Sequence, residues 1–175
     1  MGHKDANVVH LFLLRRIAPS ALRYEPGAAP VRLSLHTDYA LRTLMHLGLH
    51  QDRLCSIAEI AGAHRISQNH LMKVVHQLGK LGFVTTLRGR HGGLRLARDA
   101  QRITVGEVVR ATEEGLDLLE CGSCLLVPAC ALTGVLHEAM RDFLAVLDRA
   151  SIADLVKRPA RMKKLLGEPA AVQAR

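Results

Sequence analysis

The chain has 175 residues, of which 49% are hydrophobic and 3% aromatic, and its formal net charge is +8. This length fits one domain, or one small domain plus an oligomerisation helix, and the aliphatic composition favours packed helices over a β-sandwich. No stretch reaches the roughly 18 apolar residues of a membrane span, and the apolar run at 8–14 has its arginines after it, unlike a signal peptide.

The charge is unevenly distributed along the chain. Residues 31–110 hold 12 Lys and Arg against 5 Asp and Glu, whereas residues 111–158 hold 4 against 8. A basic half followed by an acidic half is typical of a nucleic-acid-binding domain joined to a separate sensing or dimerising module. The alternative, a generally basic surface without a nucleic-acid partner, stays open on charge alone.

Residues 1–30 end in a Pro- and Gly-containing stretch, and a regular pattern starts only after it. We expect this segment to be an N-terminal extension that is disordered or not translated. A helix is then predicted over 35–49, and the capping box formed by Ser56 and Glu59 predicts a short second helix.

Ser67 is expected to cap a third helix, which ends at Gly82. The few residues between the second and third helices predict a helix-turn-helix. Two β-prone runs around Gly89, Gly92 and Gly93 then predict a hairpin, the wing of a winged helix. The winged helix-turn-helix DNA-binding domain is therefore assigned to residues 31–112.

Polar and basic side chains gather at the start of the third helix and on the hairpin. Amides at such a helix start can contact adenine in the major groove, and arginines on a narrow hairpin suit the minor groove and phosphates. A solvated polar surface is the alternative for any one of them. The candidate DNA-binding residues are Ser67, Gln68, Asn69, His70, Lys73, Arg88, Arg90, His91 and Arg95.

Three cysteines, Cys121, Cys124 and Cys130, lie within ten residues, and the only other one is Cys55. Clustered thiols without a secretion signal indicate a metal or iron–sulfur site in a reducing cytoplasm. We predict a cluster-binding loop over 113–131 and interpret Cys55 as structural. The alternatives are a zinc site and a dithiol oxidoreductase, but the βαβ pattern expected of the latter does not surround the motif. We therefore expect no enzymatic activity.

After the loop, a long helix is predicted with one apolar face. This face is longer than so small a domain can cover. We predict a dimerisation helix over 132–158, with packing inside the chain as the alternative, and a flexible tail over 159–175. The expected fold class is mainly α: a winged helix-turn-helix with a small β-hairpin wing and a long C-terminal dimerisation helix.

Three motifs carry a resemblance to a known family. They are His36-Thr-Asp-Tyr-Ala-Leu-Arg42, Ser67-Gln-Asn-His-Leu-Met-Lys-Val-Val-His-Gln-Leu78 and Leu87-Arg-Gly-Arg-His-Gly-Gly-Leu-Arg-Leu96. They closely resemble the winged-helix iron–sulfur regulators that include IscR and NsrR, and the whole of residues 31–157 looks most like the NsrR-type nitric-oxide-sensing repressors.

The resemblance implies a homodimer that binds a palindromic operator in double-stranded DNA. Each iron–sulfur cluster, [4Fe-4S] or [2Fe-2S] with the former favoured, would be held by Cys121, Cys124, Cys130 and a fourth ligand. IscR-like proteins use a histidine at the position of Thr133, whereas the NsrR pattern implies Asp38 of the partner protomer. From sequence alone, an N-cap of the first helix is the alternative role for Asp38.

The implied function is an iron–sulfur-dependent transcriptional repressor that senses nitric oxide through cluster nitrosylation, releases DNA and derepresses nitric oxide detoxification genes. The alternative is a regulator of the same fold that responds to iron, cluster supply or redox state, as IscR does. Relatives separate the first two cysteines by four or five residues. Here two residues separate Cys121 from Cys124, which leaves the conformation of the loop and the cluster type open.

Overall fold

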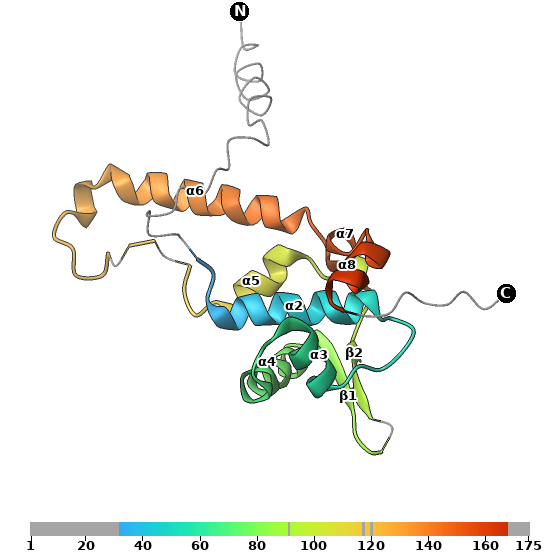
Figure 1. Cartoon of the computed structure of the whole chain (residues 1–175). Helices are drawn as coiled ribbons and strands as arrows, with labels where there is room; N and C mark the ends of the chain where they lie inside the picture. Colours follow the sequence, from blue (N-terminus) through green and yellow to red (C-terminus); the bar gives the residue numbers. More distant parts are fainter. Residues whose placement is uncertain (1–31, 91, 117, 120, 168–175) are drawn as a thin grey trace, which may run out of the picture. The chain divides into compact units, whose positions relative to one another are not determined.

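The computed structural model describes residues 32–90, 92–116, 118–119 and 121–167, so the expected N-terminal extension lies outside the described residues. The fold is mainly helical with one two-stranded antiparallel hairpin, which confirms the expected fold class (Figure 1). The elements in chain order are α2 Leu35–Leu49, α3 Ile57–His64, α4 Gln68–Lys80, β1 Val84–Leu87, β2 Gly93–Leu96, η1 Ala100–Arg102, α5 Val105–Thr112, η2 Val127–Ala129, α6 Ala131–Asp148, α7 Ile152–Leu155 and α8 Pro159–Leu165.

Capping residues set the starts of the helices in the DNA-binding region. Ser34 caps α2, Ser56 and Glu59 form a complete capping box at α3, and Ser67 caps α4. Such side chains satisfy backbone N–H groups that have no partner within the helix. After α4, Gly82 adopts a φ of 76°, the left-handed conformation that commonly follows a helix end. The capping box at α3, the Ser67 cap and the helix end at Gly82 were correctly predicted from the sequence, whereas the Ser34 cap was not.

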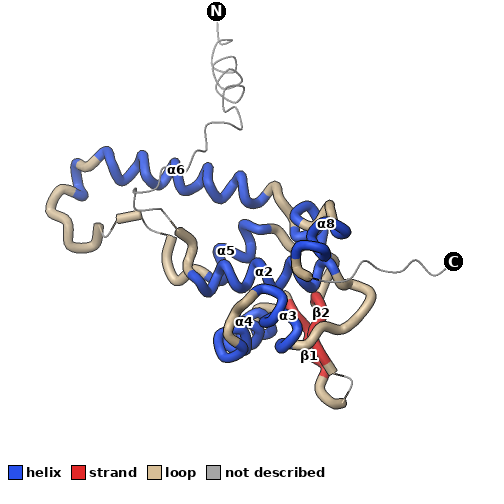
Figure 2. Tube along the Cα trace, viewed as in Figure 1, coloured by secondary structure: helices blue, strands red, loops and turns tan. Residues whose placement is uncertain are grey.

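Helix α2 is the centre of the packing. It contacts α3, α4, α5, α7 and β2 (Figure 2), and its residues Ala40, Leu44 and Leu47 are almost completely buried. The apolar face of α4 and the residue Phe83 complete the same hydrophobic core. The core therefore holds the helix-turn-helix and the hairpin together as one domain.

The hairpin is fastened to the segment between α2 and α3. Cys55 forms a β-bridge with Leu94, with N···O distances of 3.0 and 2.8 Å. This close approach requires glycine at position 93, because a Cβ there would lie 2.9 Å from Leu54 Cβ and 3.0 Å from the Cys55 carbonyl oxygen. The wing consequently has a fixed origin on the helix-turn-helix.

The first turn of α2 is joined to the end of α5 by polar contacts. The hydroxyls of Thr37 and Thr112 lie 2.8 Å apart and are buried. The backbone N–H of Ser34 donates to a carboxylate oxygen of Glu113 at 2.8 Å. The segment that leads to the cysteines therefore starts at a point anchored on α2.

Helix α6 is joined to the domain at its C-terminal end. Two guanidinium nitrogens of Arg110 on α5 donate hydrogen bonds to the Asp148 carboxylate, each at 2.6 Å. Gly106 of α5 has no side chain, which lets the two helices approach closely at Asp148. The element predicted over 132–158 is interrupted after Asp148, and α7 follows. Among the described residues, no helix has both the length and the apolarity needed to cross a membrane.

The segment expected to be a flexible tail begins with a short helix. Helix α8 begins with Pro159 at its first turn, where the missing N–H has no cost, and continues through residues with high helix propensity. The remainder of the predicted tail, from residue 168, lies outside the described residues.

Candidate nucleic-acid interface and metal loop

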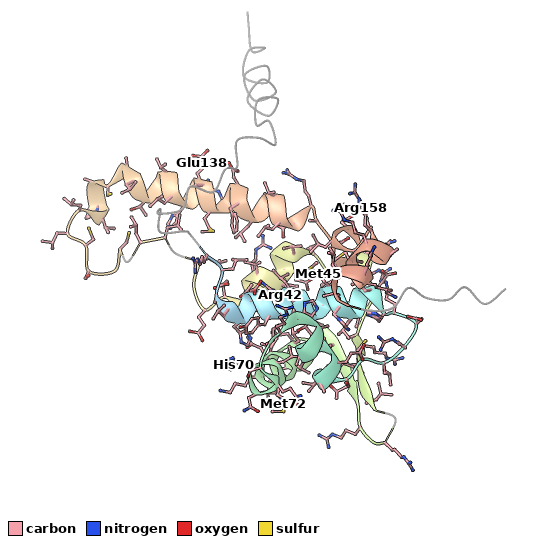
Figure 3. The ribbon with its side chains drawn as sticks, viewed as in Figure 1. Arg42, Met45, His70, Met72, Glu138 and Arg158 are labelled. Carbon is pink, nitrogen blue, oxygen red and sulfur yellow. The ribbon has the colours of Figure 1, made fainter. Side chains whose placement is uncertain are left out.

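The amphipathic pattern of α4 determines which of its side chains are exposed. Leu71, Val74, Val75 and Leu78 are buried, so Gln68, Asn69, His70 and Lys73 are exposed on the opposite face. Figure 3 labels the exposed residues His70 and Met72 on this helix, and the His70 ring lies 6.5 Å from that of Tyr39 on α2. The Ser67 hydroxyl accepts the His70 N–H at 3.3 Å, so its first role is to cap the helix.

The hairpin presents basic side chains beside this helix. Arg88, Arg90 and Arg95 are exposed, whereas His91 lies outside the described residues. Gly89 has a φ of 113°, and a Cβ at Gly92 would collide with the carbonyl of Leu87. Glycines therefore permit the tight turn that brings arginines to the tip of the wing.

Two further residues of α4 join this surface. A hollow of about 510 Å³ between α4 and β1 is lined by His76, Lys80 and Arg88, among other residues. The sequence interpretation missed His76 and Lys80. Their spacing from Asn69 and Lys73 contains the signal, because positions 69, 73, 76 and 80 lie on one helical face.

The cysteines lie around the N-terminus of α6. Cys130 immediately precedes the helix, and the backbone N–H groups of Thr133 and Leu132 lower the pKa of its thiol. The Cys121 sulfur lies 3.8 Å from the Thr133 hydroxyl, so residue 133 contacts the environment of both cysteines. A helix N-terminus stabilises thiolate, the form that binds metal.

Cys124 completes the loop on its exposed side. Its N–H donates to the Cys121 carbonyl at 3.2 Å, which makes the Cys-x-x-Cys segment a tight turn. The sulfurs of Cys121, Cys124 and Cys130 do not form a group within 4.8 Å of one another. Two thiolates on one zinc ion would lie at most about 4.6 Å apart, because Zn–S bonds are about 2.3 Å. The loop would therefore have to close further to bind one zinc ion, whereas the thiolate ligands of a cluster bind different iron atoms.

A cavity of about 310 Å³ lies behind Cys121. It brings His137 to the same space as Cys121, so this imidazole is a further candidate ligand within the chain. The other side chains that line it are mostly apolar. The lining residues are Leu116, Leu118, Leu119, Cys121, Thr133, Leu136, His137, Met140, Arg141 and Leu144.

Asp38 does not cap α2, because Ser34 holds that position. The alternative role considered for Asp38 is therefore wrong. Its carboxylate pairs with Arg42 at 2.9 Å, one turn further along the helix, and its side chain is 37% exposed. To bind iron, the Asp38 carboxylate would have to give up its ion pair with Arg42.

Known proteins are similar to this chain over most of its length. Residues 33–158 match the Rrf2 family, which is described as iron-dependent transcriptional regulators. The HTH-type transcriptional regulator NsrR of Shouchella clausii is 46% identical over 142 residues, which cover 78% of this chain and 95% of that protein. NsrR of Bacillus subtilis is 45% identical over 142 residues, which cover 78% of this chain and 97% of that protein.

A solved structure supports the same assignment. T. potens IscR superposes with a TM-score of 0.63 at 26% sequence identity, covering 75% of this chain and 90% of that one. The matches include the winged helix, the cysteine segment and α6 in one continuous alignment range. The chain therefore belongs to the Rrf2 family of transcriptional regulators.

Proposed function

We propose that the chain is a dimeric repressor that binds a palindromic operator and releases it when nitric oxide reaches an iron–sulfur cluster. The observation that supports this most directly is the meeting of Cys121 and Cys130 around Thr133 at the start of α6. In this proposal residues 31–112 bind DNA, residues 113–131 hold the cluster and residues 132–158 join two protomers. The expected cytoplasmic location stays a prediction.

The proposed ligands are Cys121, Cys124 and Cys130, with Asp38 of the partner protomer as the fourth and [4Fe-4S] as the favoured type. When bound, such a cluster supplies iron with which nitric oxide can react. A carboxylate is a harder ligand than a thiolate, so its iron would be the easiest to reach. In the structure Asp38 pairs with Arg42, so Arg42 would stabilise this carboxylate wherever it does not hold iron.

Sensing requires that the loop favour one DNA-binding geometry over another. Two connections supply this coupling. Glu113 joins the start of the loop to the first turn of α2, and Asp148 joins the far end of α6 to α5. Movement of the loop is thus transmitted to the helix on which α4 packs.

Homodimerisation is proposed to occur through α6. None of its residues is buried within the chain, and Leu132, Val135, Phe143 and Val146 are 42–60% exposed. With Ala139 they follow the three- and four-residue spacing of a helix–helix seam. Phe143→Asp should yield monomer in light scattering, whereas Glu138→Gln should remain dimeric. A dimeric Phe143→Asp protein would place the interface elsewhere.

The test uses anaerobically reconstituted protein and a duplex selected by that protein from a random pool. Nitric oxide should weaken binding about 10- to 100-fold, and the apo protein should bind equally weakly. Cys124→Ser is expected to lose the visible cluster absorption and the nitric oxide response. Equal operator affinity for apo and cluster-loaded protein would refute the proposed function.

The alternative signal is iron or cluster supply. Thr133 argues against it, because this side chain lacks the imidazole that IscR-like proteins place at this position. Operator binding that ignores nitric oxide but falls on iron depletion would favour the alternative, with the same fold and the same cysteines.

A further inference from the structure

Two histidines and a cysteine meet in the core of the winged helix, apart from the cysteine loop. His46 and His50 are one turn apart on α2, and Cys55 follows that helix. The exposed fractions of the three residues are 0%, 3% and 0%. Their donor atoms all lie within 4.8 Å of one another. Spacing of four residues places both imidazoles on one helical face, as in known zinc sites.

Neighbouring groups orient both imidazoles for metal binding. The Nδ1 of His50 lies 2.9 Å from the His46 carbonyl oxygen. A carbonyl can only accept, so Nδ1 carries the hydrogen and Nε2 keeps its lone pair. The Nε2 of His46 lies 3.5 Å from a carboxylate oxygen of Glu59. Metal-binding histidines characteristically donate their second nitrogen to a carbonyl or a carboxylate, as His50 Nδ1 does here.

We propose that His46, His50 and Cys55 form a second metal site, which binds Zn²⁺. Two imidazole nitrogens and one thiolate are ligands that zinc prefers in a tetrahedral site. With Zn–N bonds of about 2.0–2.1 Å and a Zn–S bond of about 2.3 Å, the donors would approach to about 3.4–3.6 Å. His64, whose ring centroid is 5.4 Å from that of His46, or a water completes the coordination.

The position of this site gives it a structural role. Cys55 is bridged through its backbone to Leu94 of β2, while His46 lies in the last turn of α2 and His50 is the C-cap of that helix. A metal ion bound by all three would therefore connect α2 to the strand that carries the wing. Removing it should loosen the wing without affecting the cysteine loop, so the site does not depend on the proposed nitric oxide response.

The alternative is a hydrogen-bonded His/Cys core that binds no metal, and a cobalt titration decides between them. The experiment uses the full chain with Cys121→Ser, Cys124→Ser and Cys130→Ser, so that the loop cannot contribute. Co²⁺ should bind at one ion per chain with a thiolate-to-cobalt charge-transfer band, and Zn²⁺ should displace it. Saturating Zn²⁺ should raise the melting temperature by about 5–10 °C.

Variants within this triple-serine background assign the ligands. Cys55→Ser should abolish the charge-transfer band, and His50→Gln should weaken Co²⁺ binding at least about 100-fold. His76→Gln, on the exposed face of α4, is the matched control and should bind as the parent does. A folded parent that binds no Co²⁺, or a band that survives Cys55→Ser, would overturn the proposal. The first outcome decides the question even where Cys55→Ser does not fold.

Discussion

Replacing Gly93 with alanine introduces a methyl group where the hairpin meets the segment between the first two helices of the DNA-binding domain. The new Cβ would lie 2.9 Å from Leu54 Cβ and 3.0 Å from the Cys55 carbonyl oxygen. Neither neighbour is the flexible end of a long side chain. The bridge between Cys55 and Leu94, with its two hydrogen bonds, must therefore open.

The cost follows from these contacts. Two backbone hydrogen bonds contribute about 1 kcal/mol each, and overpacking adds about 1–2 kcal/mol. Alanine returns about 0.5–1 kcal/mol by restricting the unfolded chain. We expect Gly93→Ala to lower the free energy of unfolding by about 2–3 kcal/mol and the melting temperature by about 5–10 °C.

Urea denaturation measures the loss of stability, and hydrogen exchange of the Leu94 amide measures the opening of the bridge. Gly62→Ala is the matched control, because a Cβ there has nothing within 4 Å, and it should stabilise α3 by about 0.5–1 kcal/mol. Wild-type stability of Gly93→Ala, or unchanged protection of the Leu94 amide, would show that the bridge does not fix the wing.

Three further expectations concern DNA, iron and pH. Arg90→Ala should reduce the slope of log affinity against log salt by about 0.9, as expected for one lost phosphate contact, whereas Lys164→Ala on α8 should leave it unchanged; an unaltered slope for Arg90→Ala would remove this residue from the interface. Asp38→Ala should lower cluster iron content and Thr133→His should restore it in the double variant, because residue 133 lies beside Cys121; failure of this rescue would contradict the proposed ligand geometry. Hydrogen bonding with Lys157 and Ser151 lowers the pKa of Asp154, so its contribution to stability is complete above its ordinary pKa near 3.8 and is lost as the pH falls. Thermal melts of Asp154→Asn should therefore depend less on pH below about 4 than those of the wild type, and identical pH profiles would contradict this reasoning.

Much of the fold could be predicted because its signals are local. Ser56 with Glu59, Ser67 at the recognition helix and Gly82 after it each act within a few residues of the chain. The bounds of α2 were predicted, but its cap was not, because Asp38 was considered for that role and Ser34 was not. The structure selects Ser34, whose hydroxyl accepts the Thr37 N–H.

The candidate sites were predictable to different degrees. Cys121 and Cys130 are close in sequence, so their clustering was evident before their positions around α6 were known. The core cluster was missed, because Cys55 was interpreted as structural and the histidines were not considered together. Their four-residue spacing on an expected helix was the available signal, but only tertiary packing brings Cys55 to them.

The polar contacts that anchor Glu113 on α2 and Asp148 on α5 have a mechanical consequence. The cysteine segment and α6 form a strap that is fastened to the same domain at both ends. A change in the conformation of this segment can therefore shift the domain as a rigid body, while the hydrophobic core of the domain stays intact. In the proposed dimer, a signal received at the cysteine sulfurs would therefore change the orientation of the two DNA-binding domains without unfolding either of them.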